Sequence, residues 1–212
     1  MAVRSMPDHG NPIQDMKYSA GNVSNLLWYV ETRETARLLQ KRTMEETLHL
    51  VMEENLYQQR SRTRLLREFQ CIRKRLEALP ESLVKSLPEM DINTSKLVVL
   101  IGAMATDRLL FELLYEVYGD HLRLGIEALR NTDILLFFQR KAEQSAVVAG
   151  WSQSAIQKLK QTYVKYMLEA GLISNVDKYT KRIHRIYVSP EVKNILSDED
   201  MEVFLYALTG ER

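Results

Sequence analysis

Hydrophobic residues recur at helical spacing through most of the chain, and this pattern predicts a mainly α fold. Between positions 23 and 41 the spacing fits two short helices or one bent helix. Thr43 and Glu46 have the spacing of a capping box, which predicts a helix over 44–54. A long amphipathic helix is expected over 60–79, because its apolar residues share one face and its arginines the other.

The centre of the chain has the densest hydrophobic pattern, and the segment 94–130 is expected to be helical and to supply the core. Gly119 and Asp120 are expected to end one helix and to cap the next, which would run over 121–129. The apolar run that follows Asp133 could be a buried strand, but its position between helices favours a helix.

The stretch 150–190 departs from the succession of helices: it predicts a helix that ends at a glycine, followed by two short strands joined by a loop. Ser152 is the expected N-cap, and Gly171 is the expected left-handed residue that ends the helix. A helix followed by a two-stranded ribbon is the outline of a winged helix-turn-helix; the alternative is a solvated helix beside a surface hairpin. The Ser-Pro pair at 189–190 and the stretch 197–200 each predict the start of a further helix.

A chain of 212 residues is long enough for one or two domains, and the pattern divides it into four regions. We expect a flexible N-terminal tail (1–17), an N-terminal helical region resembling a helix-turn-helix (18–80), a central helical core (81–149) and a C-terminal region resembling a winged helix (150–212).

The net charge of +1 hides a strong segregation of charge along the chain. Residues 60–75, the first basic island, hold six arginines and one lysine against one glutamate. Residues 151–188, the second basic island, hold five lysines and two arginines against two acidic residues. The remaining segments are net acidic, so the positive potential is focused where a polyanion could dock.

The first basic island follows a short helix and a turn, which is also the outline of a helix-turn-helix pair over 43–79. The interpretations that remain open are nucleic-acid contact, an acidic partner protein and a plain solvated face, since arginine is a good helix former. The candidate phosphate contacts are Arg60, Arg62, Arg64, Arg67 and Lys74.

The second basic island places amides and cations on the helix face opposite its apolar residues. Its candidate DNA contacts are Gln157, Lys158, Gln161 and Lys165 on the helix and Lys181 and Arg182 on the return strand. Only the two glutamines are suited to hydrogen bond with base edges, so a weak sequence preference is expected.

No constellation of catalytic or metal-binding residues is visible. The chain has one cysteine, Cys71, so it can form neither an internal disulfide nor a cysteine metal site. Arg67 and Lys74 could lower the thiol pKa, but no histidine base lies in the neighbouring sequence, which favours a structural thiol. Glu46 and His49 have the spacing of a di-iron helix motif but lack a second copy. We therefore expect no enzyme activity, cofactor, metal or small-molecule substrate.

The longest strongly apolar run, 97–105, is too short to cross a bilayer. A chain with one cysteine also suits a reducing compartment. We therefore expect a cytoplasmic protein with no membrane partner.

Five short segments together resemble the BrxA family, small components of BREX (bacteriophage exclusion) defence systems. They are Ser19-Ala20-Gly21, Arg73-Lys74-Arg75-Leu76, Asp133 with Phe137-Phe138 and Lys141, Trp151-Ser152, and Ala170-Gly171-Leu172-Ile173. The resemblance covers roughly residues 18–208 and is one of layout rather than of a tight motif. It implies a cytoplasmic, non-enzymatic, DNA-binding helical bundle similar to NusB, acting beside a DNA methyltransferase, a large ATPase and an alkaline-phosphatase-like protein.

Composition, pattern and resemblance together predict a double-stranded-DNA-binding accessory protein of a BREX phage-defence system. Its DNA contacts would fall on the two basic islands. The alternatives are a protein–protein adaptor that assembles the defence complex and an RNA-binding protein similar to NusB.

Overall fold

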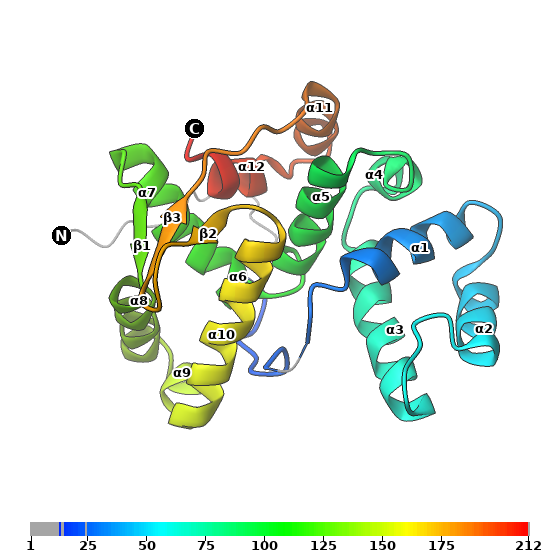
Figure 1. Cartoon of the computed structure of the whole chain (residues 1–212), viewed down its shortest axis with the longest axis horizontal. Helices are drawn as coiled ribbons and strands as arrows, with labels where there is room; N and C mark the ends of the chain where they lie inside the picture. Colours follow the sequence, from blue (N-terminus) through cyan, green and yellow to red (C-terminus); the bar gives the residue numbers. More distant parts are fainter. Residues whose placement is uncertain (1–12, 14, 24, 212) are drawn as a thin grey trace.

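The computed structural model describes residues 13, 15–23 and 25–211, and the mainly α fold is confirmed (Figure 1). Most of the predicted tail lies outside the described residues, although Ile13 is fully buried. The first half of the chain forms α1 (Tyr29–Leu39), α2 (Met44–Glu54), α3 (Arg62–Glu77), α4 (Glu81–Ser86), α5 (Ile92–Met104), α6 (Arg108–Leu113), the π-helix η1 (Leu114–Tyr118) and α7 (Gly119–Leu124).

The second half contains a small sheet between helices. Its elements are β1 (Ala128–Arg130), α8 (Asn131–Gln144), α9 (Ala146–Ala149), α10 (Gln153–Glu169), β2 (Ile173–Asn175), β3 (Thr180–Ile183), α11 (Pro190–Asp198) and α12 (Glu202–Thr209). The strands are antiparallel in the order β1-β3-β2, with Arg182 opposite both Ala128 and Ser174. The hairpin predicted after α10 is therefore confirmed, with β1 as an unexpected third strand.

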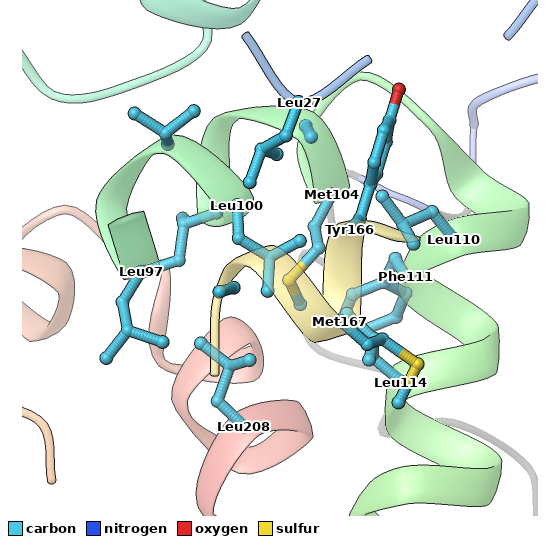
Figure 2. Packing of buried hydrophobic residues seen from close by; sticks show 14 of the residues in the cluster. Leu27, Leu97, Leu100, Met104, Leu110, Phe111, Leu114, Tyr166, Met167 and Leu208 are labelled. Atoms are coloured by element: carbon cyan, nitrogen blue, oxygen red, sulfur yellow. The ribbon is translucent and has the colours of Figure 1, made fainter. Parts of the chain in front are cut away.

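Helix α5 lies at the centre of the core, as its mostly uncharged sequence predicts. Its Leu97, Leu100 and Met104 lie with Met167 of α10 and Leu208 of α12 (Figure 2). The buried hydrophobic residues form one cluster with members from the N-terminal, central and C-terminal regions. Burial of these side chains supplies the main driving force for folding.

The helix termini follow local sequence signals. Thr43 Oγ1 accepts the Glu46 N–H at 3.2 Å, and Glu46 Oε2 accepts the Thr43 N–H at 2.8 Å, so the predicted capping box is confirmed. Ser152 caps α10, and Gly171 adopts a φ of 77° directly after it. Ser189 caps α11, which begins with the proline at position 190.

Of the helical stretch predicted over 23–41, the part in α1 is confirmed but the start is wrong, because α1 begins only at Tyr29. Residues 15–23 and 25–28, here called the N-terminal strap, have no helical structure. Other parts of the chain donate to the strap carbonyls: Arg75 to Leu26 and Leu27, and Thr162 to Val23. These tertiary hydrogen bonds take acceptors that a helix would have paired internally.

The helix predicted over 121–129 is also wrong. The chain remains helical through Gly119, passing from α6 through η1 into α7, and turns at Gly125, where φ is 68°. Residues after this turn form β1, which pairs with β3. The partner strand lies some fifty positions later in the chain, so helical spacing around β1 could not indicate it.

The stretch 197–200 does not start the last helix as predicted. Helix α11 continues to Asp198, and α12 begins at Glu202 without a side-chain cap. Ser197 instead donates its hydroxyl to the Glu202 carboxylate at 2.7 Å, so it lies near the end of one helix and touches the start of the next. Ser197 therefore links the end of α11 to the start of α12 and does not cap the N-terminus of α12.

Gly102 of α5 sets the distance between α3 and α5. A Cβ atom there would lie 2.8 Å from the carbonyl oxygen of Arg75, a backbone atom that cannot move independently. Gly102→Ala is therefore expected to lower the free energy of unfolding by about 1–3 kcal/mol in urea titrations. Gly150→Ala is the control, because its Cβ would meet nothing closer than 3.4 Å. Equal effects of the two substitutions would contradict this interpretation.

The structure bears on two further sequence features, the spacing of Glu46 and His49 and the apolar run 97–105. Glu46 is engaged in the capping box, and no group of three or more histidine, cysteine, aspartate or glutamate side chains suited to a metal ion occurs within 13, 15–23 and 25–211. Among the same residues, no helix is both long and apolar enough to cross a bilayer. Helix α5, which contains most of the longest apolar run, ends after 13 residues.

Candidate nucleic-acid interface

Helix α3 begins with positive charges and no negative ones. Ser61 caps it by accepting the Arg64 N–H at 3.3 Å, and the first turn contains no acidic residue. Arg60, Arg62, Arg64 and Arg67 are all exposed around this end. The N-terminus of a helix carries a partial positive charge, so these arginines oppose the helix dipole. The arrangement favours an anion at this end of α3.

Most of these cations have no carboxylate partner. The structure shows no ion pair for Arg60, Arg64 or Arg67 among the described residues, and Arg62 makes only a 3.4 Å contact with Glu53, both being exposed. Ser61, Thr63, Arg64 and Arg67 line a shallow cavity of about 330 Å³. The guanidinium groups around it are free to bind phosphate.

The other two arginines of this island have structural roles. Arg73 pairs with Glu77 at 2.7 Å and with Glu45 at 3.9 Å. Arg75 is buried, donates to Tyr166 Oη at 2.8 Å and lies over the rings of Trp28 and Tyr166. Neither arginine was among the predicted phosphate contacts, whereas Lys74, which was, is exposed.

Glu68 is the only acidic residue of the first basic island, and it does not offset the positive charge at the surface. Its side chain is 1% exposed, and both carboxylate oxygens lack a hydrogen-bond partner among the described residues. Burial raises the pKa of Glu68 from 4.5 to about 7, with a smaller contribution from the nearby charge of Glu31.

Arg67 and Lys74 do act to lower the pKa of Cys71, as the sequence suggests, but burial outweighs them. Burial raises the pKa of the Cys71 thiol, and this effect exceeds the opposing influence of Arg75, Lys74 and Arg67. The Asn25 side-chain amide lies 3.5 Å from the sulfur. Cys71 is therefore a packing residue between α3 and the N-terminal strap.

Helix α10 presents the predicted polar face. Its apolar side, with Leu159 and Tyr163, is buried, and its N-cap is Ser152. The candidates Gln157, Lys158, Gln161 and Lys165 are all exposed. As in α3, the first turn contains no acidic residue. These four side chains are thus available to one ligand surface.

The two candidate DNA contacts on the hairpin, Lys181 and Arg182, differ in exposure. Arg182 is exposed, but Lys181 is 9% exposed and its Nζ donates to the carbonyl of Asp177 at 3.1 Å, which weakens its case as a phosphate contact. The loop adds the exposed Lys178, which sequence reasoning missed, and the 62%-exposed Tyr179. Loop position and residue type were the available signals for Lys178.

Arg130 is a further exposed cation beside the hairpin that was not among the predicted DNA contacts. It is exposed at the end of β1, opposite Thr180 of β3, and therefore close to the hairpin. Its segment was expected to be helical, so no sequence signal placed it there. Its backbone N–H donates to the Asp133 carboxylate at 2.7 Å, which fixes the start of α8.

The two basic helices are joined at their inner ends. Arg75 of α3 donates to Tyr166 Oη of α10, and Tyr166 donates to the strap carbonyl of Asn25 at 3.2 Å. In Figure 1 the N-terminal ends of α3 and α10 both lie at the lower edge of the molecule. The basic ends therefore lie on one side, with the N-terminal strap between the helices.

Similarity to known proteins identifies the family of this chain. The BrxA family profile matches residues 16–200. The chain belongs to the BrxA family. A BREX protein BrxA from Bacillus cereus (strain H3081.97) is 30% identical over 200 residues, which span 94% of this chain and 100% of the relative.

Two more distant proteins extend the BrxA comparison. A BREX protein BrxA from Escherichia coli O9:H4 (strain HS) is 25% identical over 183 residues, covering 86% of this chain and 85% of the relative. The crystal structure of an uncharacterized protein from Magnetospirillum magneticum superposes with a TM-score of 0.77 at 22% identity, covering 92% of this chain and 100% of that one. The latter shows that the BrxA chain described here shares its fold with a solved structure.

Proposed function

We propose that this BrxA-family protein is a non-enzymatic, cytoplasmic, double-stranded-DNA-binding accessory component of a BREX phage-defence system. The observation that carries the proposal is the cluster of arginines at the N-terminus of α3, without acidic residues in the first turn. These positive charges are repelled by the positive end of the helix dipole, and a bound anion would offset that repulsion. A polyanion that meets several guanidinium groups at once fits this cluster.

The connectivity of the C-terminal half supports a duplex as the ligand. The order α7, β1, α8, α9, α10, β2, β3, with β1 beside β3, resembles that of a winged helix with the short helix α9 added. In this arrangement α10 has the position of the recognition helix, and its exposed Gln157 and Gln161 are suited to base edges. The hairpin loop would contact the backbone beside it. The partners implied by family membership are other BREX components, namely the methyltransferase, the ATPase and the phosphatase-like protein.

A salt titration tests the proposal. The Arg60→Ala/Arg64→Ala/Arg67→Ala variant is expected to bind duplex DNA more weakly, because three phosphate contacts are lost. The slope of log affinity against log salt concentration should fall in magnitude by about 2–3, since each contact contributes about 0.9. Fluorescence anisotropy with a labelled 20-base-pair duplex measures this slope.

Arg73→Ala is the matched control, because it removes an arginine from the same helix that is already paired with Glu77. Its slope should equal that of the unaltered protein. An unchanged slope in the triple variant would exclude the end of α3 from the interface. Stronger competition by duplex RNA than by duplex DNA would favour the RNA-binding alternative instead.

A further inference from the structure

A buried acid lies close to the cations at the start of α3. Glu68 follows Arg64 by one helical turn, which places the two side chains on the same side of the helix, and it comes directly after Arg67. Arg64 and Arg67 are exposed, whereas the Glu68 side chain is 1% exposed. The stretch that holds candidate phosphate contacts therefore also holds a titratable group that water does not reach.

No described residue donates a hydrogen bond to the Glu68 carboxyl group. Tyr57, in the connection between α2 and α3, is within electrostatic range of Glu68, but its hydroxyl proton is already used. Thr35 donates its hydroxyl to the carbonyl of Glu31 at 2.7 Å, so Tyr57 is the donor in the 2.5 Å hydrogen bond between Tyr57 Oη and Thr35 Oγ1. A buried carboxyl group with no donor favours the neutral, protonated form.

Charges on two helices act on this carboxyl group in opposite directions. Helix α1 packs against α3, and the negative charge of Glu31 on α1 disfavours ionisation of Glu68. The positive charge of Arg64 on α3 favours ionisation, but burial is the largest influence and raises the pKa of Glu68 to about 7. Arg64 is thus the cation that stabilises an ionised Glu68, and it also lines the shallow cavity at the start of α3.

A phosphate bound in this cavity would compete with Glu68 for the charge of Arg64. The phosphate would engage the guanidinium group and would also add a second negative charge near the carboxyl group. Both effects disfavour the ionised form of Glu68. The protonated form has no such conflict, because a neutral acid neither attracts Arg64 nor repels a phosphate.

We propose that Glu68 takes up a proton when a duplex binds at the start of α3, so that this buried acid makes DNA affinity dependent on pH. The inference rests on the proposed function and adds a regulation of the same site. Affinity is highest below pH 7, falls as the pH rises through 7, and levels off once the complex too has released the proton. For a phosphate about 8 Å from the carboxylate, at an effective dielectric constant of about 40–80, the loss is about two- to sixfold.

Titration of a labelled 20-base-pair duplex at fixed ionic strength, from pH 5.5 to pH 8.5, tests the proposal. The affinity of the unaltered protein should fall about two- to sixfold more over this range than that of Glu68→Gln, since the histidines titrate equally in both proteins. Calorimetry at pH 7.5 in two buffers of different protonation enthalpy should detect proton uptake by the unaltered protein that Glu68→Gln lacks. Circular dichroism at each pH confirms that both proteins are folded.

Glu54→Gln is the matched control. Glu54 is exposed, and exposed glutamates are already ionised at pH 5.5, so this substitution should change the affinity by the same factor at every pH. In an Arg64→Ala background, Glu68→Gln should alter the pH dependence less, because the shared cation is gone.

The same pH dependence and proton uptake in the unaltered protein and Glu68→Gln would overturn the inference while leaving duplex binding in place. An undiminished effect of Glu68→Gln in the Arg64→Ala background would overturn it as well, since the coupling would not pass through Arg64. Absence of duplex binding at every pH would instead remove the proposed function, and this inference with it.

Discussion

Replacing Lys141 by methionine is expected to lower the free energy of unfolding by about 3–5 kcal/mol. Lys141 of α8 is 3% exposed, and its Nζ lies 2.8 Å from Glu112 Oε2 and 2.5 Å from Glu116 Oε1. Glu112 is itself buried and also binds Tyr18 Oη and Arg108 Nε, each at 2.8 Å. Without Lys141, two carboxylates would remain close together in the protein with less compensating charge.

Urea unfolding measures this loss, with Lys85→Met as the matched control. Lys85 also pairs with a glutamate, Glu81, but both side chains are largely exposed, so a change within about 0.5 kcal/mol is expected. Adding Glu112→Gln to Lys141→Met should recover part of the loss, because it removes one uncompensated charge. Similar effects of Lys141→Met and Lys85→Met would show that the buried network does not stabilise the fold.

Glu68→Gln is expected to raise the free energy of unfolding by about 2–3 kcal/mol at pH 8. The pKa of Glu68 rises from 4.5 to about 7 on folding because the carboxyl group is buried, with no hydrogen-bond partner among the residues that the structure describes. The native state consequently holds this proton more tightly than the unfolded state. The contribution of Glu68 to stability is complete below pH 4.5 and is lost as the pH rises through 7.

The measurement is the difference in unfolding free energy between the unaltered protein and Glu68→Gln from pH 5 to pH 8. This difference should grow with pH, whereas the exposed Glu54→Gln should give a nearly constant difference, since Glu54 has no ion pair with the described residues. A flat difference for Glu68→Gln would show that the carboxyl group is hydrated or paired in solution. Other buried carboxyl groups contribute equally to the unfolding free energies of both proteins, so their contributions cancel in the difference.

Local signals in the sequence were sufficient to predict where many helices begin or end. The capping box at Thr43, the serine caps of α10 and α11 and the glycine after α10 all depend on residues within one turn of each other. The errors lie where distant residues decide the conformation. The N-terminal strap is apolar enough for a helix but donors from α3 and α10 occupy its carbonyls, and β1 exists only because β3 lies beside it.

The candidate interface was predictable as two islands of charge but not residue by residue. Helical spacing correctly placed Arg64, Arg67 and Lys158 at the surface. Helical spacing does not apply to Lys181 and Arg182, which are neighbours on strand β3. Alternation along the strand places Lys181 on the buried face with Ile183 and leaves Arg182 exposed. The Lys181 ammonium is also held by the carbonyl of Asp177, in a loop where Asp177 Oδ1 accepts the N–H groups of Tyr179 and Thr180.

The partners of Arg75 and Tyr166 in the N-terminal strap are carbonyl oxygens, which every amino acid possesses. Mutations that alter only the strap side chains at these positions would therefore leave the acceptors in place, whereas loss of Arg75 or Tyr166 would remove the donors. For these hydrogen bonds the demand for a particular amino acid falls on the two helices. Elsewhere in the strap the side chains matter, because Trp28 lies against Arg75 and Tyr18 binds Glu112.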